Sequence, residues 1–189
     1  MKFNHKADYE LQRQLLAHQD RLFASYSKLM MLRIDFAYLK EGDGFEFVDM
    51  HQIAADMTHL IEQVNELVGV VGFAWVLEYG EVHRFHIHAV FYINGQRYQR
   101  VWHFWKDIRV IWKEVTEGER YAYHCTPQAH YRVQGECVIA HDDVRGRQGL
   151  QHVLKYLAKE SQRTPRRVYQ YSDVPEKQKG GRKRRVNSH

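Results

Sequence analysis

The amino-acid sequence predicts an α+β domain built on a central, mainly antiparallel sheet with flanking helices. Segments with apolar residues at every third or fourth position alternate with segments whose polarity changes residue by residue. Two of the alternating segments are joined by a short loop, which is typical of an antiparallel hairpin. A chain of 189 residues is long enough for one substantial core, so one domain is expected.

Helical spacing of apolar residues predicts helices at residues 7–26, 53–67, 102–115 and 148–161. The second helix is expected to end near Gly69, because glycine commonly follows the last turn of a helix. The third is rich in tryptophan. We interpret these tryptophans as core residues rather than as a surface on which bases stack.

Alternating polarity predicts strands at residues 29–38, 70–79, 85–92 and 137–141. The loop at 80–84 makes the second and third strands a hairpin, and a turn is expected at 42–44. Residues 118–135 have no firm period and are interpreted as a loop or weak strand. Near the C-terminus, extended structure is expected only at 168–171.

Positive charge is concentrated in the last quarter of the chain. Residues 1–143 contain 15 lysines and arginines against 20 acidic residues, whereas residues 144–189 contain 13 against 3. The basic residues around the last predicted helix are expected to form a salt-sensitive phosphate-binding surface. Those between 177 and 185 lie among glycine and polar residues, which is typical of a disordered, solvated tail.

The sequence argues against a membrane or secreted protein. It has no run of about 18 uncharged apolar residues, and its first residues lack the apolar stretch of a signal peptide. Cys125 and Cys137 are the only cysteines, too few for a disulfide framework. We therefore expect a soluble intracellular protein in which both thiols are ordinary small side chains.

Two histidines share one face of the predicted strand 85–92. Because successive strand residues point to opposite faces, His86 and His88 stand side by side, opposite to Phe85 and Ile87. Neutral imidazoles are good ligands for divalent cations. In a chain with 13 histidines, however, two half-exposed strand histidines are an equally good interpretation of this pair.

Strand pairing adds a carboxylate to the histidines. Across a three-residue hairpin loop, Glu78 lies opposite His86, with Cβ atoms about 5 Å apart. The strand at 29–38 places Arg33 and Asp35 on the face opposite to its apolar residues. One face of the sheet is therefore predicted to be apolar and the other to carry ionisable groups. Two imidazoles and a carboxylate suit Mg²⁺ or Mn²⁺ engaged with phosphate, although imidazoles also accept Zn²⁺.

Tyr156 lies away from the apolar face of the predicted helix 148–161, on a flank that it shares with Lys159 and Arg163. A phenol there can attack phosphorus if a metal polarises the phosphate and a lysine offsets the developing charge. Tyrosine and lysine are common on exposed helices. The prediction therefore depends on the combination with the histidines.

This combination resembles the HUH endonuclease superfamily, and within it the inovirus-type replication initiators, which also occur in prophages and plasmids. The resemblance covers residues 29–172, between an N-terminal helix at 1–28 and a basic, disordered tail at 173–189. Its motifs are Trp75-x-x-Glu78-Tyr-Gly, His86-x-His88, Tyr156-Leu-Ala-Lys159 and Arg166-Arg-Val-Tyr-Gln-Tyr-Ser172. The order of histidines before tyrosine favours an initiator or a transposase over a conjugative relaxase.

The resemblance implies a palm-like fold with a five-stranded antiparallel sheet, whose fifth strand we expect between residues 120 and 133. It implies that His86, His88 and Glu78 hold Mg²⁺ or Mn²⁺. Tyr156 would attack the scissile phosphate, leaving a 5′-phosphotyrosine and a free 3′-OH, while Lys159 positions or neutralises that phosphate. The residues expected to bind DNA are Arg33, Lys155, Arg163, Arg166 and Arg167.

The implied function is nicking and rejoining of single-stranded DNA at an origin hairpin, during rolling-circle replication of a phage or plasmid in the bacterial cytoplasm. A single tyrosine on the helix leaves rejoining to the DNA 3′-OH or to a second protomer of a homodimer. No phosphate-binding Gly-x-x-x-x-Gly-Lys-Ser/Thr motif is present, so a helicase and a polymerase are expected from the host.

Three alternatives remain open at this point. The same chemistry serves single-strand transposases of the HUH class. A non-catalytic nucleic-acid-binding module would use the sheet and the basic C-terminal quarter, with the histidines incidental. A zinc-structured domain would use His124, Cys125, Cys137 and His141, whose spacing matches no familiar zinc finger.

Overall fold

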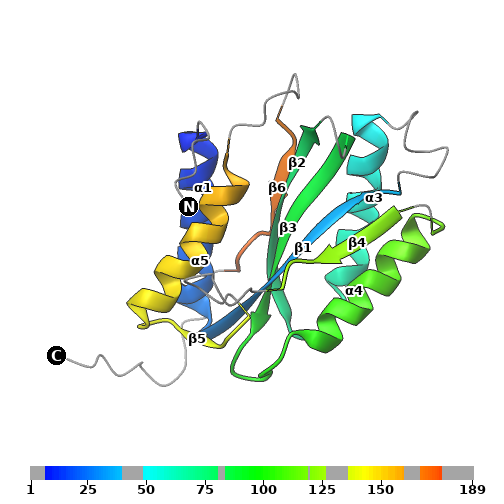
Figure 1. The fold of residues 1–189 in the computed structure, drawn as a ribbon. Coiled ribbons are helices and arrows are strands. Elements are labelled where there is room, and N and C mark those ends of the chain that lie inside the picture. The colour runs from blue at the N-terminus through cyan, green and yellow to red at the C-terminus, as the bar shows by residue number, and fades with distance from the viewer. Residues whose placement is uncertain are drawn as a thin grey trace.

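The computed structural model describes residues 7–39, 49–80, 84–118, 120–126, 136–159 and 167–175, and the turn expected at 42–44 lies outside them. It confirms an α+β fold, an antiparallel sheet flanked by helices (Figure 1). The helices are α1 (Tyr9–Ser25), α3 (Met50–Val64), α4 (Trp102–Val115) and α5 (Val144–Leu157). The strands are β1 (Lys28–Tyr38), β2 (Val70–Gly80), β3 (Arg84–Asn94), β4 (Arg120–His124), β5 (Ile139–Ala140) and β6 (Tyr169–Tyr171).

The strand order in the sheet is β4-β1-β3-β2-β6, and the short β5 pairs with the beginning of β1. Every pairing is antiparallel. The fifth strand expected between residues 120 and 133 is β4, which forms one edge of the sheet. In the β2–β3 hairpin, Gly80 pairs with Arg84 and Glu78 with His86, the register predicted from the loop length.

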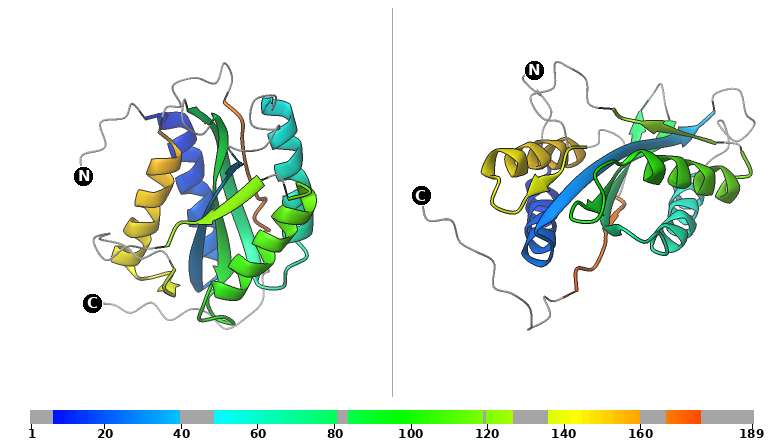
Figure 2. Two further views of the ribbon diagram at one scale, coloured as in Figure 1. Left: turned by 45° about the vertical axis from the view of Figure 1, so that its right-hand side comes forward. Right: turned by 90° about the horizontal axis from the view of Figure 1, so that it is seen from below.

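Helices cover both faces of the sheet. Figure 2 shows α3 and α4 on one side and α1 and α5 on the other. The larger apolar cluster lies under α3 and α4, where Phe36, Phe91 and Trp112 are almost fully buried. A second cluster lies under α1 and α5 and includes Leu15 and Leu154. The domain therefore has three layers, with an apolar cluster on each side of the sheet.

The prediction that the second face of the sheet carries ionisable groups is correct at one end only. The other end of that face is apolar and packs against α1 and α5, through Leu29, Met31, Ala74, Val76, Val90 and Tyr92. The physical reason is that the apolar sides of two helices must be buried against apolar sheet residues. The ionisable groups gather where this packing ends.

Helix α5 begins and ends earlier than predicted. The side chain of Asp143 caps its first turn by accepting the Gly146 N–H at 2.9 Å. The helix ends at Leu157, so Lys159 lies just beyond its last residue. There Lys159 forms an isolated antiparallel bridge with Ala7. The segment after α5 is thus tied to the beginning of α1.

The tryptophans of α4 divide into two groups. Trp105 and Trp112 are core residues, as predicted, but Trp102 is 57% exposed. It occupies the first position of the helix, where its ring lies outside the apolar cluster. Within the described parts of the chain, no helix is long and apolar enough to cross a membrane.

A buried histidine joins α1 to the sheet. His18 has no exposed surface, and its Nε2 lies 3.0 Å from the hydroxyl of Ser172, which in turn accepts the Phe73 N–H at 3.1 Å. Its ring packs against Tyr92 and Tyr171. Burial, reinforced by the charge of Arg21, lowers the pKa of His18 to about 4.

This burial predicts that the protein loses stability in mild acid. Below pH 6.5 the unfolded chain protonates His18, whereas the folded chain resists protonation until about pH 4. The free energy of unfolding should fall through this range, with His18 contributing about 3 kcal/mol. Urea titrations at pH 7 and pH 4 should show a smaller loss in His18→Gln than in the wild type. An equal loss of unfolding free energy in both proteins would show that His18 does not cause the acid sensitivity.

Candidate metal and phosphoryl-transfer site

Glu78, His86 and His88 form a group that could hold a metal ion. The Glu78 Oε2 lies 3.8 Å from His86 Nε2 and 3.4 Å from His88 Nε2. One donor atom from each residue lies within 4.8 Å of the other two, and among the described residues this is the one group of three or more such ligands. The parity of β2 and β3 places all three side chains on the same face of the hairpin.

Each imidazole is oriented by a hydrogen bond at its other nitrogen. His88 Nδ1 lies 2.7 Å from Asp35 Oδ1, and His86 Nδ1 lies 3.0 Å from the backbone carbonyl of Arg84. An ionised carboxylate and a carbonyl oxygen only accept, so both rings donate from Nδ1. This leaves each Nε2 to face Glu78, the arrangement in which outer residues orient metal-binding histidines. The donor set therefore fits a divalent cation.

Asp35 is a candidate site residue that the sequence alone did not identify as one. The alternation of β1 placed it on the correct face, but its partner depends on β1 lying beside β3, with Asp35 opposite His88. Nothing in a single sequence fixes this neighbour relation, because β1 and β3 are separated by α3 and β2. The available signal was an acidic residue at a site-facing position of a strand.

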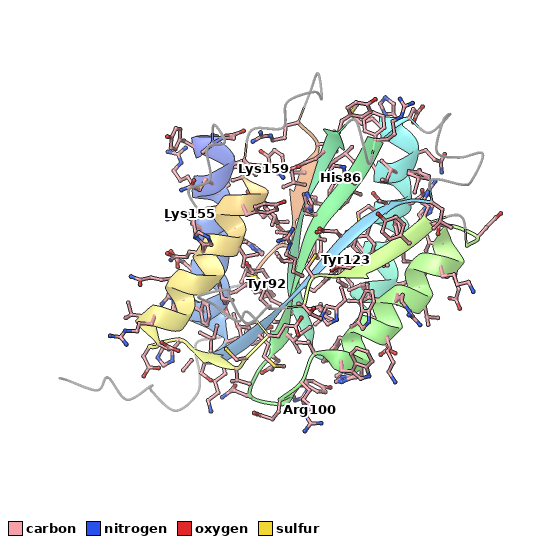
Figure 3. All side chains as sticks on the ribbon, viewed as in Figure 1. His86, Tyr92, Arg100, Tyr123, Lys155 and Lys159 are labelled. Carbon is pink, nitrogen blue, oxygen red and sulfur yellow. The ribbon has the colours of Figure 1, made fainter. Side chains whose placement is uncertain are left out.

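The predicted nucleophile and lysine lie directly beside this group. Lys159 Nζ is 3.1 Å from Glu78 Oε2 and 3.2 Å from the Tyr156 hydroxyl. The Tyr156 ring lies 5.5 Å from the His88 ring, centroid to centroid. Figure 3 shows Lys159 at the end of α5, on the same side of the sheet as His86. The structure thus brings together all five residues predicted as catalytic or metal-binding.

Tyr156 is less exposed than the helix pattern predicted. Its ring is half-buried and packs against the edge of the apolar cluster beneath α5. The guanidinium of Arg33 lies over one side of the ring, with Cζ 4.5 Å from its centroid, and Arg33 also pairs with Asp35 at 3.3 Å. The phenol therefore contacts two cations, Arg33 and Lys159, at the boundary of the apolar region.

Neighbouring opposite charges shift the pKa values of Asp35, Glu78 and Lys159 toward their ionised forms. Burial by itself would raise the pKa of Asp35, but the His88 hydrogen bond and the Arg33 charge outweigh it and lower the pKa to about 2. The pKa of Glu78 is lowered against the same effect of burial by His88 and Lys159. The charge of Glu78 raises the pKa of Lys159, again against burial. Two carboxylates and an ammonium therefore stay ionised at neutral pH.

The neighbours of His88 favour its protonated form. Burial opposes the charge, but hydrogen bonds to Asp35 and Glu78 raise its pKa. A metal ion held by His88 would take the place of the second ring proton, while Nδ1 keeps its hydrogen bond to Asp35. Metal binding at such a site therefore releases a proton.

The residues predicted to bind DNA occupy different environments. Arg33 lies inside the site. Lys155 is exposed on the side of α5 that points away from His86 (Figure 3). Arg167 pairs with Asp8 and donates to the Lys159 carbonyl at 3.1 Å, so it holds the segment after α5 in place. Arg163 and Arg166 lie outside the described residues. DNA binding by these residues stays a prediction.

The zinc-structured alternative has no geometric support. His124 is paired with Glu136 and stacks on Trp105 at 5.1 Å. Burial, together with the charge of Asp35, raises the pKa of the Cys125 thiol to about 12, which disfavours the thiolate that zinc requires. The four proposed ligands, all among the described residues, form no metal-binding group.

Comparison of the chain with protein families, with characterised proteins and with solved structures finds no match.

Asp35 should control metal affinity although it is not a ligand. We expect Asp35→Ala to weaken Mn²⁺ binding by about 10- to 100-fold, because His88 loses the hydrogen bond that orients it. Isothermal titration calorimetry would measure the affinity. Glu10→Ala, which removes an exposed carboxylate on α1, serves as the matched control. Equal affinities for Asp35→Ala and the wild type would show that Asp35 does not orient the site.

Proposed function

We propose that this protein is a metal-dependent endonuclease and strand transferase that cuts single-stranded DNA through a covalent bond to Tyr156. One observation carries the proposal. The Lys159 ammonium lies within 3.2 Å of both the Tyr156 hydroxyl and the Glu78 carboxylate, so a candidate nucleophile adjoins a metal-binding group. Tyrosine and lysine on an exposed helix would mean little, but here they meet two histidines and a carboxylate from other elements.

In the proposed reaction the Tyr156 oxygen attacks the scissile phosphorus, and the bond from phosphorus to the 3′ oxygen breaks. The DNA is left with a 5′-phosphotyrosine on the protein and a free 3′-OH, and the phenolic proton balances the charge on the departing oxygen. A divalent cation held by His86, His88 and Glu78 would polarise the phosphate. Lys159 and Arg33, which both contact the phenol, offset the negative charge that develops at phosphorus.

Mn²⁺ or Mg²⁺ is the proposed cofactor. Two imidazoles and one carboxylate leave coordination positions for phosphate oxygens and water. Burial of the site, where Glu78 and His88 are 4% and 6% exposed, strengthens the electrostatic interactions on which the reaction depends.

The biological role that we propose is initiation of rolling-circle replication of a phage or plasmid. It rests on the resemblance of the motifs around Glu78, His86 and Tyr156 to inovirus-type initiators of the HUH superfamily. The break leaves a 3′-OH, which a polymerase can extend, and the covalent bond preserves the energy for rejoining. The helicase and polymerase would come from the host.

Covalent capture of DNA is the direct test. Incubation with labelled single-stranded origin hairpins in Mn²⁺ should give a protein–DNA adduct that survives denaturing electrophoresis. EDTA or Tyr156→Phe should abolish the adduct, whereas Tyr169→Phe, which alters another partly exposed tyrosine, should not. An adduct that persists in Tyr156→Phe, or no adduct with any hairpin tested, would overturn the proposal.

Lys159 should affect the chemical step more than DNA binding. We expect Lys159→Met to slow single-turnover adduct formation by about 100-fold at saturating DNA, because it removes a cation beside the attacking oxygen. Lys155→Met is the matched control, since it removes an exposed lysine of α5, one turn before Lys159, that points away from the site. Equal rates in the two variants would remove Lys159 from the proposed mechanism.

A further inference from the structure

Edge strand β4 presents two tyrosines on the same face of the sheet as the candidate site. Alternate residues of β4 face the opposite way: Arg120, Ala122 and His124 point toward α3 and α4. Tyr121 and Tyr123 therefore point toward the site face. Tyr123 is 56% exposed and Tyr121 is half-buried. Exposed tyrosines are common on edge strands. Whether Tyr121 and Tyr123 have a binding role therefore depends on where they lie relative to the candidate site.

The sheet register puts these tyrosines next to the metal-binding group. Tyr123 lies opposite Asp35 on β1, and Asp35 lies opposite His88 on β3. At about 4.8 Å between neighbouring strands, Tyr123 and His88 are about 10 Å apart across the sheet. Tyr121 lies opposite Ala37, one step along the same face. Figure 3 shows Tyr123 on β4 beside β1.

The opposite side of β4 is firmly anchored. Arg120 forms a buried ion pair with Asp56 of α3, and its guanidinium lies 3.9 Å from the centroid of the Tyr38 ring. His124 stacks on Trp105 of α4. These contacts fix the backbone of the strand, so the positions from which the two tyrosines project are set before any ligand binds. A ligand that binds them therefore loses less free energy to ordering the protein.

We propose that Tyr123, with Tyr121 beside it, is a platform on which bases of the single-stranded substrate stack next to the scissile phosphate. This inference rests on the function proposed above. A distance of about 10 Å is spanned by roughly three stacked nucleotides, or fewer in an extended strand. Arg33 lies over the Tyr156 ring and pairs with Asp35, the residue opposite Tyr123, so it supplies positive charge near the path of the phosphates.

Single-stranded nucleic acid is the ligand that fits this surface best. Aromatic rings bind unpaired bases through their faces, which a duplex hides in its stack, and such stacking tolerates any base. The platform would hold the nucleotides beside the cleavage position irrespective of their sequence. The proposed role of Tyr123 is therefore to position the strand and not to take part in the chemistry.

Binding is best measured in the Tyr156→Phe background, where cleavage cannot interfere. We expect Tyr123→Ala to weaken single-stranded DNA binding by about tenfold in fluorescence anisotropy, and Tyr123→Phe to retain affinity because it keeps the ring. Tyr123→Ile preserves strand propensity without an aromatic face, so it should bind as weakly as the alanine variant. Trp102→Ala, which removes an equally exposed ring from α4, should bind normally.

An abasic scan identifies the contact itself. One abasic nucleotide, moved along the oligonucleotide, should weaken binding at one or two positions within about three nucleotides of the scissile phosphate. In Tyr123→Ala the same abasic substitutions should have no further effect, because the base and the ring form one interaction. The platform would be overturned if, at every position, the abasic substitution and Tyr123→Ala weakened DNA binding additively. It would also be overturned if Tyr123→Ile and Tyr123→Phe bound single-stranded DNA with equal affinity.

The two proposals fail in different ways. If the wild-type protein forms the adduct but Tyr123→Ala binds DNA normally, the platform is wrong and the nuclease stands. If ring-dependent binding is found without any adduct, the nuclease is wrong, and Tyr123 binds bases in a non-catalytic DNA-binding protein. Loss of affinity in Trp102→Ala equal to that in Tyr123→Ala would contradict a platform confined to the site face.

Discussion

Removing the Glu78 carboxylate from water costs free energy that only cationic or hydrogen-bonding neighbours can offset. Here those neighbours are His88 and Lys159, with His86 slightly farther away. They come from a strand and from the segment after a helix, so one buried charge fixes how the end of α5 sits on the β2–β3 hairpin. Asp35 extends the same chain of charges to β1. A divalent cation would enter an arrangement whose geometry is already set.

The site occupies the boundary between two environments on one face of the sheet. Toward the beginning of β1 that face is apolar and covered by α1 and α5, whereas toward its end the face carries ionisable groups. Tyr156 stands at this boundary, with its ring on the apolar cluster and its hydroxyl toward Lys159. Packing thus restricts the ring, and the polar end remains beside the metal-binding group.

Local patterns in the sequence predicted most of the elements, including the register that places Glu78 opposite His86, because hairpin parity depends on only a few neighbouring residues. Relations between distant segments were beyond those patterns. The pairing of Asp35 with His88 requires β1 to lie beside β3, and the apolar half of the site face requires α1 and α5 to dock there. The end of α5 was also misplaced, since Leu157 and Lys159 both suit a helix by composition. The proposed chemistry stays a prediction, because proximity alone does not establish reactivity.

The bridge between Ala7 and Lys159 has a consequence for how the protein is made. Because Asp8 donates its N–H to the Ala158 carbonyl and Arg167 reaches both Asp8 and Lys159, the segment before α1 is joined to the segment after α5. The ribosome must release residues up to Lys159 before this lysine can pair with Ala7. Until then the apolar side of α1 lacks α5 as its partner. Contacts of such long sequence separation slow folding, so the candidate site forms only after residues up to Arg167 have left the ribosome.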